Sequence, residues 1–241
     1  MNDQISVESN GLEHAEIQEV LGIAKELARQ NKIIQPALLY KIAKRRLKLE
    51  SETLLSIINL LLKNKILIEG SKLLKQEVLL NPYRVDIFRF IKTYPGVHFS
   101  VIRKKVFSEG GKTGSTGQFI WHIEVLMKFN FIKRIQVKNY SLFLSSDMDE
   151  ELGIYYFLLR DRINRKIVIY LNNNEPIEQA QIPNKILESK GSVYYHIKTL
   201  EEYKVLLLEK NNDTGNKEVR LDQEKKELFI KISNDIENIK F

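Results

Sequence analysis

One ten-residue pattern occurs twice in the chain, 74 positions apart, and it constrains the fold more than any other feature. The first copy is Gly117-Gln-Phe-Ile-Trp-His-Ile-Glu-Val-Leu126 and the second is Gly191-Ser-Val-Tyr-Tyr-His-Ile-Lys-Thr-Leu200. In both copies an apolar residue, an aromatic-His-Ile triplet and a leucine fall at helical spacing, and another aromatic residue follows three positions after the leucine. The pattern therefore predicts a duplicated module that contains one amphipathic helix in each copy.

Turn signals divide the chain into several modules. Asn81-Pro82 marks one boundary, because proline fixes its own backbone and disfavours helix in the residue before it. We predict an acidic N-terminal arm at residues 1–11, a degenerate module at 12–80, two further modules at 81–147 and 148–221, and a C-terminal helix at 222–241.

Hydrophobic periodicity predicts the same order of elements in each module. In the first module we expect helices at residues 12–30, 37–47 and 52–64 and a short strand at 66–68. In the second we expect helices at 83–93 and 99–107, the repeated helix, and a hairpin of strands at 131–137 and 140–144. In the third we expect helices at 155–171, 180–187 and 191–203, followed by strands at 205–208 and 217–221. The predicted fold class is mainly α with small β-hairpins, an α+β arrangement.

Composition excludes several classes of protein. The chain has no cysteine, which excludes disulfides, thiolate nucleophiles and cysteine-ligated zinc. The longest apolar runs are far shorter than the roughly 20 residues that span a bilayer, so we expect no membrane association. Residues 1–22 contain no lysine or arginine and no long apolar run, so we expect neither a signal peptide nor a transit peptide and a cytoplasmic location.

The charge balance indicates a polyanionic partner. The net charge is +7 and the isoelectric point is near 9.3, although the first 24 residues carry acids and no bases. An excess of this sign favours nucleic acid, because each neutralised phosphate releases condensed counterions. The alternative stays open that the charges serve only to solvate the surface, since 29% of the residues are charged and both signs are common.

Candidate catalytic and metal-ligating clusters are absent from the sequence. The four histidines, at positions 14, 98, 122 and 196, fall in different predicted elements and lack a ligand spacing. No spacing typical of a Ser/His/Asp group or of paired catalytic carboxylates stands out. We therefore expect no metal, no cofactor and no enzymatic activity.

The order helix, helix, turn, helix and hairpin is that of a winged helix-turn-helix domain. Residues 115–132 and 190–206, together with Tyr94-Pro-Gly-Val-His98, resemble archaeal and bacterial transcriptional regulators of the ArsR/MarR-like winged-helix superfamily. The resemblance extends over about residues 12–221 and implies tandem winged-helix modules. It implies that the third helix of a module enters the major groove of double-stranded DNA while the hairpin contacts the flanking backbone.

The candidate DNA-binding residues lie on the polar face of the repeated helices and on the basic segments around them. Phe119, Ile123 and Leu126 share one stripe and should face their own module, which leaves the opposite face for DNA. The expected DNA-binding residues are Arg103, Lys104, Lys105, Lys112, Ser115, Gln118, Trp121, His122, Lys128, Lys133, Arg134, Lys138, Lys185, Lys190, Ser192, Tyr194, Tyr195, His196 and Lys198. Polar side chains at these positions suit base edges and the cations suit phosphates.

Alternatives stay open for several of these residues. The equivalent histidines 122 and 196 either contact phosphates or share a structural role, and Trp121 and Tyr195 either face DNA or pack against a neighbouring helix. Glu124, Glu201 and Glu202 repel phosphate, so one or more modules need not contact DNA.

The sequence favours a sequence-specific DNA-binding transcriptional regulator. The alternative is a winged-helix scaffold for protein-protein interaction in a transcription or membrane-remodelling assembly. The C-terminal helix would then bind a partner or form a homodimer. A third alternative is a regulator that senses a small molecule in a pocket between modules. Aromatic residues such as Tyr155, Tyr156 and Phe157 would either line that pocket or pack in a core, and core packing is favoured. The sequence does not identify the effector.

Overall fold

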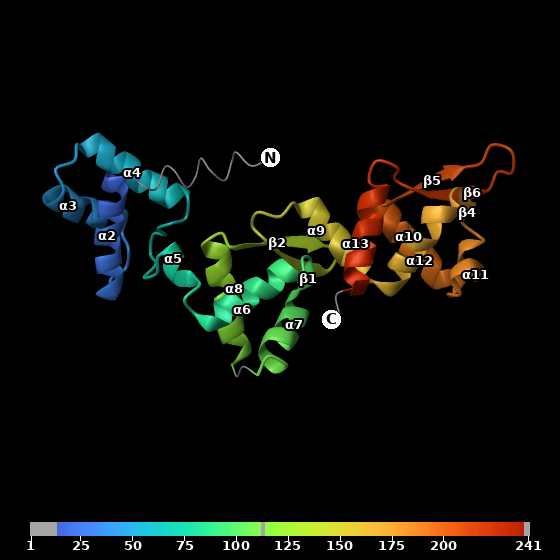
Figure 1. Cartoon of the computed structure of the whole chain (residues 1–241), viewed down its shortest axis with the longest axis horizontal. Coiled ribbons are helices and arrows are strands. Elements are labelled where there is room, and N and C mark those ends of the chain that lie inside the picture. Colours follow the sequence, from blue (N-terminus) through green and yellow to red (C-terminus); the bar gives the residue numbers. More distant parts are fainter. Residues whose placement is uncertain (1–13, 112–113, 239–241) are drawn as a thin grey trace. The chain divides into compact units, whose positions relative to one another are not determined.

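The computed structural model describes residues 14–111 and 114–238 (Figure 1). The chain divides into two compact units. Within the described residues, unit 1 comprises 14–90, 102–111 and 114–133, and unit 2 comprises 91–101 and 134–238. The chain is mainly helical with small antiparallel sheets, which confirms the predicted α+β class. No helix in the described part of the chain is long and apolar enough to cross a membrane. The proposed acidic arm, residues 1–11, lies outside the described residues.

The elements follow one another in the order that the sequence predicts, with some additions. Up to the repeated helix they are α2 (Ala15–Arg29), α3 (Pro36–Arg46), α4 (Ser51–Lys63), α5 (Lys75–Val78), α6 (Pro82–Thr93), β1 (Val97–His98), α7 (Phe99–Ile102), the π-helix η1 (Arg103–Ser108) and α8 (Thr116–Lys128). The remaining elements are β2 (Ile132–Val137), β3 (Tyr140–Ser145), α9 (Glu150–Arg160), α10 (Arg162–Asn174), β4 (Ile177–Glu178), α11 (Ile182–Ile186), α12 (Lys190–Glu202), β5 (Leu206–Lys210), β6 (Lys217–Leu221) and α13 (Lys226–Asn238).

The described residues include two three-stranded antiparallel sheets. The strand orders are β1-β3-β2 and β4-β6-β5. In the first sheet Val97 pairs with Phe143, and in the second Ile177 pairs with Val219. The two hairpins were predicted, whereas the two-residue strands β1 and β4 were not, because a strand that short leaves no periodic signal.

Three helices bury equivalent positions and end in the same way. The buried positions are Leu54, Ile58 and Leu61 in α4, Phe119, Ile123 and Leu126 in α8, and Val193, Ile197 and Leu200 in α12. The backbone oxygens of the three leucines accept hydrogen bonds from the N–H groups of Ile66, Phe131 and Val205 at 2.9, 2.9 and 2.8 Å. Each donor follows a residue with positive φ, namely Lys65, Asn130 and Lys204. This pattern is a Schellman end, and it fixes how each helix leaves its core.

The strand predicted at residues 66–68 is wrong. This segment is a loop without strand structure, although Ile34 exchanges backbone hydrogen bonds with Ser71 and Gly70 at 2.8 and 2.9 Å. The chain then enters the short helix α5, where the Glu77 carboxylate accepts a hydrogen bond from the N–H of Leu74 at 3.0 Å. Alternation of apolar residues was present, but no second strand follows to form a ladder.

The single helix predicted at residues 155–171 is also wrong, because the chain breaks at Asp161 into α9 and α10. The Asp161 carboxylate caps α10 by accepting from the N–H groups of Ile163 and Asn164 at 2.8 and 3.1 Å. Its backbone is extended, with φ −67° and ψ 130°. An aspartate can end one helix and begin the next when its carboxylate satisfies the free N–H groups, and hydrophobic periodicity does not detect this.

A pair of glycines lets a turn approach α9 closely in unit 2. Gly96 has a φ of 70°, and a Cβ added there would lie 2.4 Å from the backbone oxygen of Gly153. A Cβ at Gly153 would in turn lie 2.4 Å from the side chain of Leu144 on β3. The turn before β1, the helix α9 and strand β3 therefore pack without space for a side chain at either glycine.

The C-terminal helix α13 contributes to the core of unit 2. It packs against α9 and α10, and its residues Phe229 and Ile232 are buried. The ring of Phe229 contacts that of Tyr155 edge to face, with centroids 5.0 Å apart. The helix begins at Lys226 rather than at the predicted residue 222, because Asp222 and Glu224 form a turn after β6.

The carboxylate of Glu175 joins three elements of unit 2. It accepts hydrogen bonds from the N–H of Leu221 at the end of β6, from Gln223 Nε2 at 3.0 Å and from Lys226 Nζ at the start of α13. Burial alone would raise the pKa of Glu175, but these hydrogen bonds and the Lys226 charge outweigh it and lower the pKa. The ionised carboxylate of Glu175 therefore stabilises the folded state.

We expect Glu175→Gln to lower the free energy of unfolding by about 1–3 kcal/mol at pH 7, because it weakens charge-assisted hydrogen bonds in a mostly buried position. The lowered pKa means that this contribution is present above the pKa of the unfolded chain and is lost as the pH falls through the folded value. Urea unfolding at pH 7 and pH 3 measures both effects. The control Glu224→Gln, at an exposed position, should change stability by less than about 0.5 kcal/mol. An equal loss at both pH values would contradict the assignment.

Candidate nucleic-acid interface

The N-terminus of α8 is closed by a capping box. Ser115 Oγ accepts from the N–H of Gln118 at 3.2 Å, and Gln118 Oε1 accepts from the N–H of Ser115 at 3.0 Å. Both side chains are exposed, but their oxygens serve the helix. The side-chain amide nitrogen of Gln118 is therefore the group that remains to donate outward.

The exposed face of α8 presents an aromatic side chain whose ring contacts an arginine of α6. Trp121 is 50% exposed, and the guanidinium carbon of Arg84 on α6 lies 5.6 Å from its ring. Arg84 itself is buried, and burial lowers its pKa. A cation under one face of the indole orients the ring while the other side remains accessible. Arg84 was not predicted to be near the site, because nothing in its local sequence distinguishes it from other helical arginines.

The two equivalent histidines both face inward. His122 is buried in unit 1, and its ring lies parallel to that of Tyr83, with centroids 5.2 Å apart and an interplanar angle of 6°. The side chain of His196 in unit 2 is 14% exposed, and its Nδ1 lies 2.9 Å from Asn164 Oδ1. Of the two open alternatives, this placement favours the structural role over phosphate contact at both positions.

The hydrogen bonds of Asn164 assign the proton on His196. Asn164 is buried, and its Nδ2 donates to the backbone oxygen of Leu158 at 2.7 Å. Since a carbonyl oxygen only accepts, the amide oxygen faces His196, and the Nδ1 of that histidine carries the proton. Asp161 Oδ1 lies 3.5 Å from the same nitrogen. The break between α9 and α10 thus anchors α12 through its histidine.

We expect Asn164→Ala to destabilise the protein by about 1–3 kcal/mol, because it leaves the Leu158 carbonyl and the His196 Nδ1–H without their shared partner in a buried position. Chemical unfolding followed by circular dichroism measures the change. Asn184→Ala, at an exposed position of α11, is the matched control and should stay within about 0.5 kcal/mol of the parent. Equal stabilities of the two variants would show that the network contributes nothing.

The basic segment before α8 is partly neutralised by one carboxylate. Lys104 Nζ and Lys105 Nζ lie 3.6 and 3.0 Å from the two oxygens of Glu109, whose pKa these lysines lower. Arg103 is half-buried on the same π-helical turn, and Lys128 is exposed at the end of α8. Lys133 is half-buried on β2, and Lys112 lies outside the described residues. Unit 1 therefore brings together α8 and the cations of η1.

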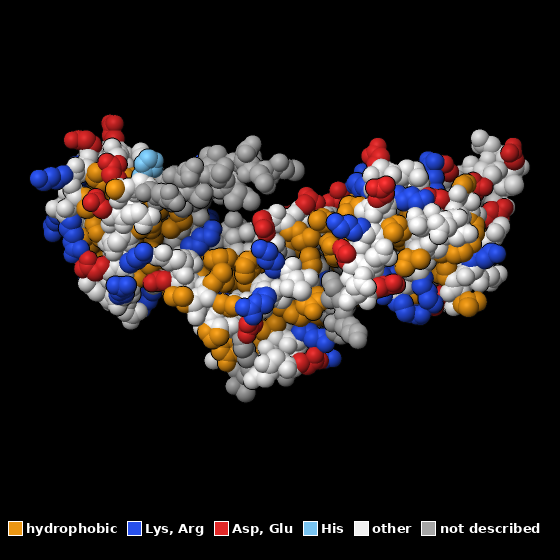
Figure 2. All heavy atoms as spheres, viewed as in Figure 1, with side chains coloured by type: hydrophobic (Ala, Val, Ile, Leu, Met, Phe, Trp, Pro, Cys, Tyr) orange, Lys and Arg blue, Asp and Glu red, His pale blue; other side chains and the backbone are white. Residues whose placement is uncertain are grey.

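The predicted residues of unit 2 lie on α11, α12 and the β2–β3 hairpin. Lys185, Lys190 and Lys198 are exposed, and Ser192 and Tyr194 are half-buried. Lys190 Nζ lies 5.5 Å from the centre of the Tyr194 ring. Arg134 is exposed on β2. Figure 2 shows lysine and arginine side chains interspersed with acidic ones over the visible face of this unit.

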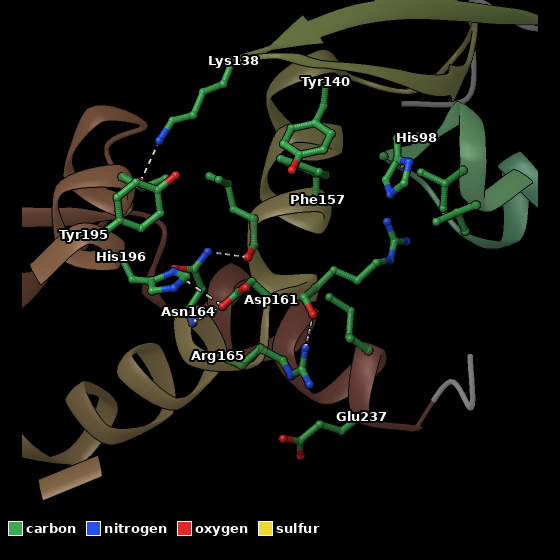
Figure 3. Close-up of a pocket in the computed structure, with 17 residues that line it drawn as sticks. His98, Lys138, Tyr140, Phe157, Asp161, Asn164, Arg165, Tyr195, His196 and Glu237 are labelled. Carbon is green, nitrogen blue, oxygen red and sulfur yellow. Dashed lines mark hydrogen bonds and ion pairs between the residues drawn. The ribbon is translucent and has the colours of Figure 1, made fainter. Parts of the chain in front are cut away.

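Lys138 contacts α12 instead of projecting away from the protein. It is the first residue of the hairpin turn and has a φ of 51°. Its Nζ donates to Thr199 Oγ1 at 2.7 Å and lies 3.7 Å from Glu202 Oε2. The same Nζ lies 5.2 Å from the centre of the Tyr195 ring (Figure 3). The Tyr195 side chain is nevertheless 62% exposed. Sequence reasoning had assigned both residues to DNA and did not anticipate that they contact each other.

Comparison with known proteins gives one distant relationship. A protein of Methanocaldococcus jannaschii named as an uncharacterized HTH-type transcriptional regulator is 29% identical to this chain over 144 residues, which is 59% of the chain. The chain spans about a third, 34%, of the length of that relative. No protein-family model matches the chain.

Proposed function

We propose that this chain is a sequence-specific, double-stranded-DNA-binding transcriptional regulator in which α8 enters the major groove. The observation that carries the proposal is the exposed face of α8. On this face the guanidinium of Arg84 contacts the ring of Trp121, and the exposed residues Gln118 and Lys128 lie on either side of Trp121 along the helix. The adjoining cations of η1 would contact phosphates and fix the position of the helix on DNA. The distant relationship to a protein named as an HTH-type regulator supports this class of function.

We further propose that the chain consists of tandem winged-helix modules at residues 12–80, 81–147 and 148–221, of the ArsR/MarR-like type. The shared buried positions of α4, α8 and α12 support this division. The first module lacks a strand after its third helix within residues 64–74, so it is the least complete of the three.

Within the third module we propose that α12 contributes to DNA binding through Ser192, Tyr194 and Lys198, with Lys185 and Lys190 on phosphates. Lys138 and Tyr195 contact each other, so we assign this pair to positioning α12. A homodimer through α13 stays a prediction. Phe229 and Ile232 of α13 are buried in the core, whereas Leu228, Ile230 and Ile236 are half-buried and keep some apolar surface that a dimer contact would cover.

We expect the double substitution Arg103→Glu with Lys104→Glu to weaken binding to every DNA sequence and to reduce the slope of log affinity against log salt by up to about 2, because two phosphate contacts are removed. Fluorescence anisotropy with genomic and random duplexes over a salt series gives both quantities.

The control is Lys92→Glu with Lys231→Glu, which makes the same change in net charge at exposed positions that belong to neither α8 nor η1. It should retain the parent slope. Equal losses in the two double variants would point to net charge alone, and the absence of any DNA retention at low salt in the parent would favour the protein-interaction scaffold.

We expect Trp121→Ala to reduce discrimination between preferred and random duplexes by about 1–3 kcal/mol while the salt slope stays unchanged, because the ring would contact base edges rather than phosphates. A selection of bound duplexes by the parent supplies the preferred sequence for competition assays. Ile120→Ala, a neighbouring residue that is 41% exposed, is the control. A Trp121→Ala protein with unchanged sequence preference and unchanged melting temperature would remove this residue from the interface.

A further inference from the structure

Unit 2 contains a cavity of about 840 Å³ that none of the DNA-binding roles proposed above uses (Figure 3). Its lining comes from β1, α7, the β2–β3 hairpin, α9, α10, α12 and the end of α13. Pockets that hold small molecules measure roughly 300–1,000 Å³, so this volume suits a ligand larger than a single aromatic ring.

Aromatic side chains from separate elements line the cavity. The ring of Tyr140 lies 5.7 Å from that of His98 and 5.4 Å from that of Phe157, measured between centroids. Tyr195 contributes a further ring from α12. Tyr140 is 49% exposed and Tyr195 is 62% exposed, so both keep ring surface that nothing in the described chain covers. Exposed rings of this kind stack on planar ligands.

Cations surround the same space. Lys138, Arg160 and Arg165 line the cavity. Arg160 Nη2 donates to the backbone oxygen of Pro95 at 2.8 Å, and Arg165 Nη1 donates to the backbone oxygens of Leu159 and Arg160 at 2.9 and 2.7 Å. These bonds hold both guanidinium groups in fixed positions. Burial lowers the pKa of Arg160 to about 10, so the group remains charged at neutral pH and favours an anion nearby.

Hydrogen-bond acceptors complete the lining. Asp161 and Glu237 are exposed residues that line the cavity, and carboxylate oxygens are able to accept hydrogen bonds from the hydroxyl groups of a ligand. His98 is held in its neutral form at pH 7, because burial and the Arg160 charge lower its pKa, and its Nδ1 lies 2.8 Å from Ser100 Oγ. A ligand that matches this lining has a planar ring, several hydroxyls and an anionic group.

We propose that this cavity binds a nucleoside phosphate, with the base stacked on Tyr195 or Tyr140, the sugar hydroxyls at Asp161 and Glu237, and the phosphate at Lys138 and Arg160. A single-ring carboxylate would leave much of the volume unfilled and the two acceptors unused. The phosphate-bearing nucleoside comes either as a free nucleotide or as the end of a single strand, and both share this chemistry. The site lies in unit 2 and does not depend on DNA binding by α8.

Isothermal titration calorimetry of the full chain with the four ribonucleoside 5′-monophosphates tests the proposal. We expect saturable binding of at least one of them, about tenfold or more tighter than the matching nucleoside or inorganic phosphate alone, because ring and anion each contribute. A 5′-phosphorylated single-stranded tetranucleotide forms a second arm and separates the free nucleotide from the strand end.

Substitutions at exposed positions locate the site. Tyr195→Ala and Lys138→Glu should each weaken binding by about tenfold or more, whereas Tyr195→Phe, which keeps the ring, should retain it. Ile169→Ala and Lys231→Glu are controls on exposed surfaces outside the cavity lining and should bind like the parent.

Two results would overturn the proposal: binding that is unchanged in Tyr195→Ala and Lys138→Glu, or no binding of any mononucleotide or of the tetranucleotide at millimolar concentration. Circular dichroism of each variant confirms that a loss of binding is not a loss of folding. Failure here leaves the DNA assays with α8 variants unaffected, so the two proposals are tested separately.

Discussion

The orientation of α4, α8 and α12 depends on one leucine in each helix, which contributes both its side chain and its backbone oxygen. Leu61, Leu126 and Leu200 place their side chains in a core, and their backbone oxygens accept the N–H that turns the chain away from the helix. The first role fixes which face of the helix is inside, and the second fixes where the helix ends. Both the exposed face of α8 and the contacts of α12 follow from this constraint, because a rotation of the helix would bury the polar side chains at the cost of the core.

The repeat preserves burial but not the partners of the buried groups. His122 stacks on Tyr83, whereas His196 forms a hydrogen bond with Asn164. An imidazole suits both environments because it offers a flat ring as well as a polar nitrogen. Likewise, Trp121 and Tyr195 occupy equivalent positions and both contact a cation, which is Arg84 in one case and Lys138 in the other. Identity of residue type between the two copies of the repeat therefore does not establish identity of function.

Local periodicity predicted much of the fold and little of the site. The repeated helices and both hairpins were predicted because their apolar spacing is a property of a few consecutive residues. The break at Asp161 depends on one carboxylate that caps a helix, and the segment at 66–68 forms no strand because no partner strand follows. Phe157 was considered as a pocket residue, but the cavity also requires His98 and Tyr195, which lie far apart in the sequence. The spacing of residues along the sequence does not predict that these distant side chains line one cavity.

Not every lysine is equally available to contact DNA, because some lysines already have partners within the protein. Lys104 and Lys105 share Glu109 through ion pairs near the surface, and such pairs contribute only about 0–1 kcal/mol. Because phosphate contact also releases counterions, exchange of Glu109 for a phosphate is favourable at low salt. Lys138 is in a different position, since its ammonium makes a direct hydrogen bond to Thr199 and lies over the ring of Tyr195. Movement of Lys138 toward a DNA phosphate would break both contacts, whereas an anion in the cavity would meet the ammonium where it already lies.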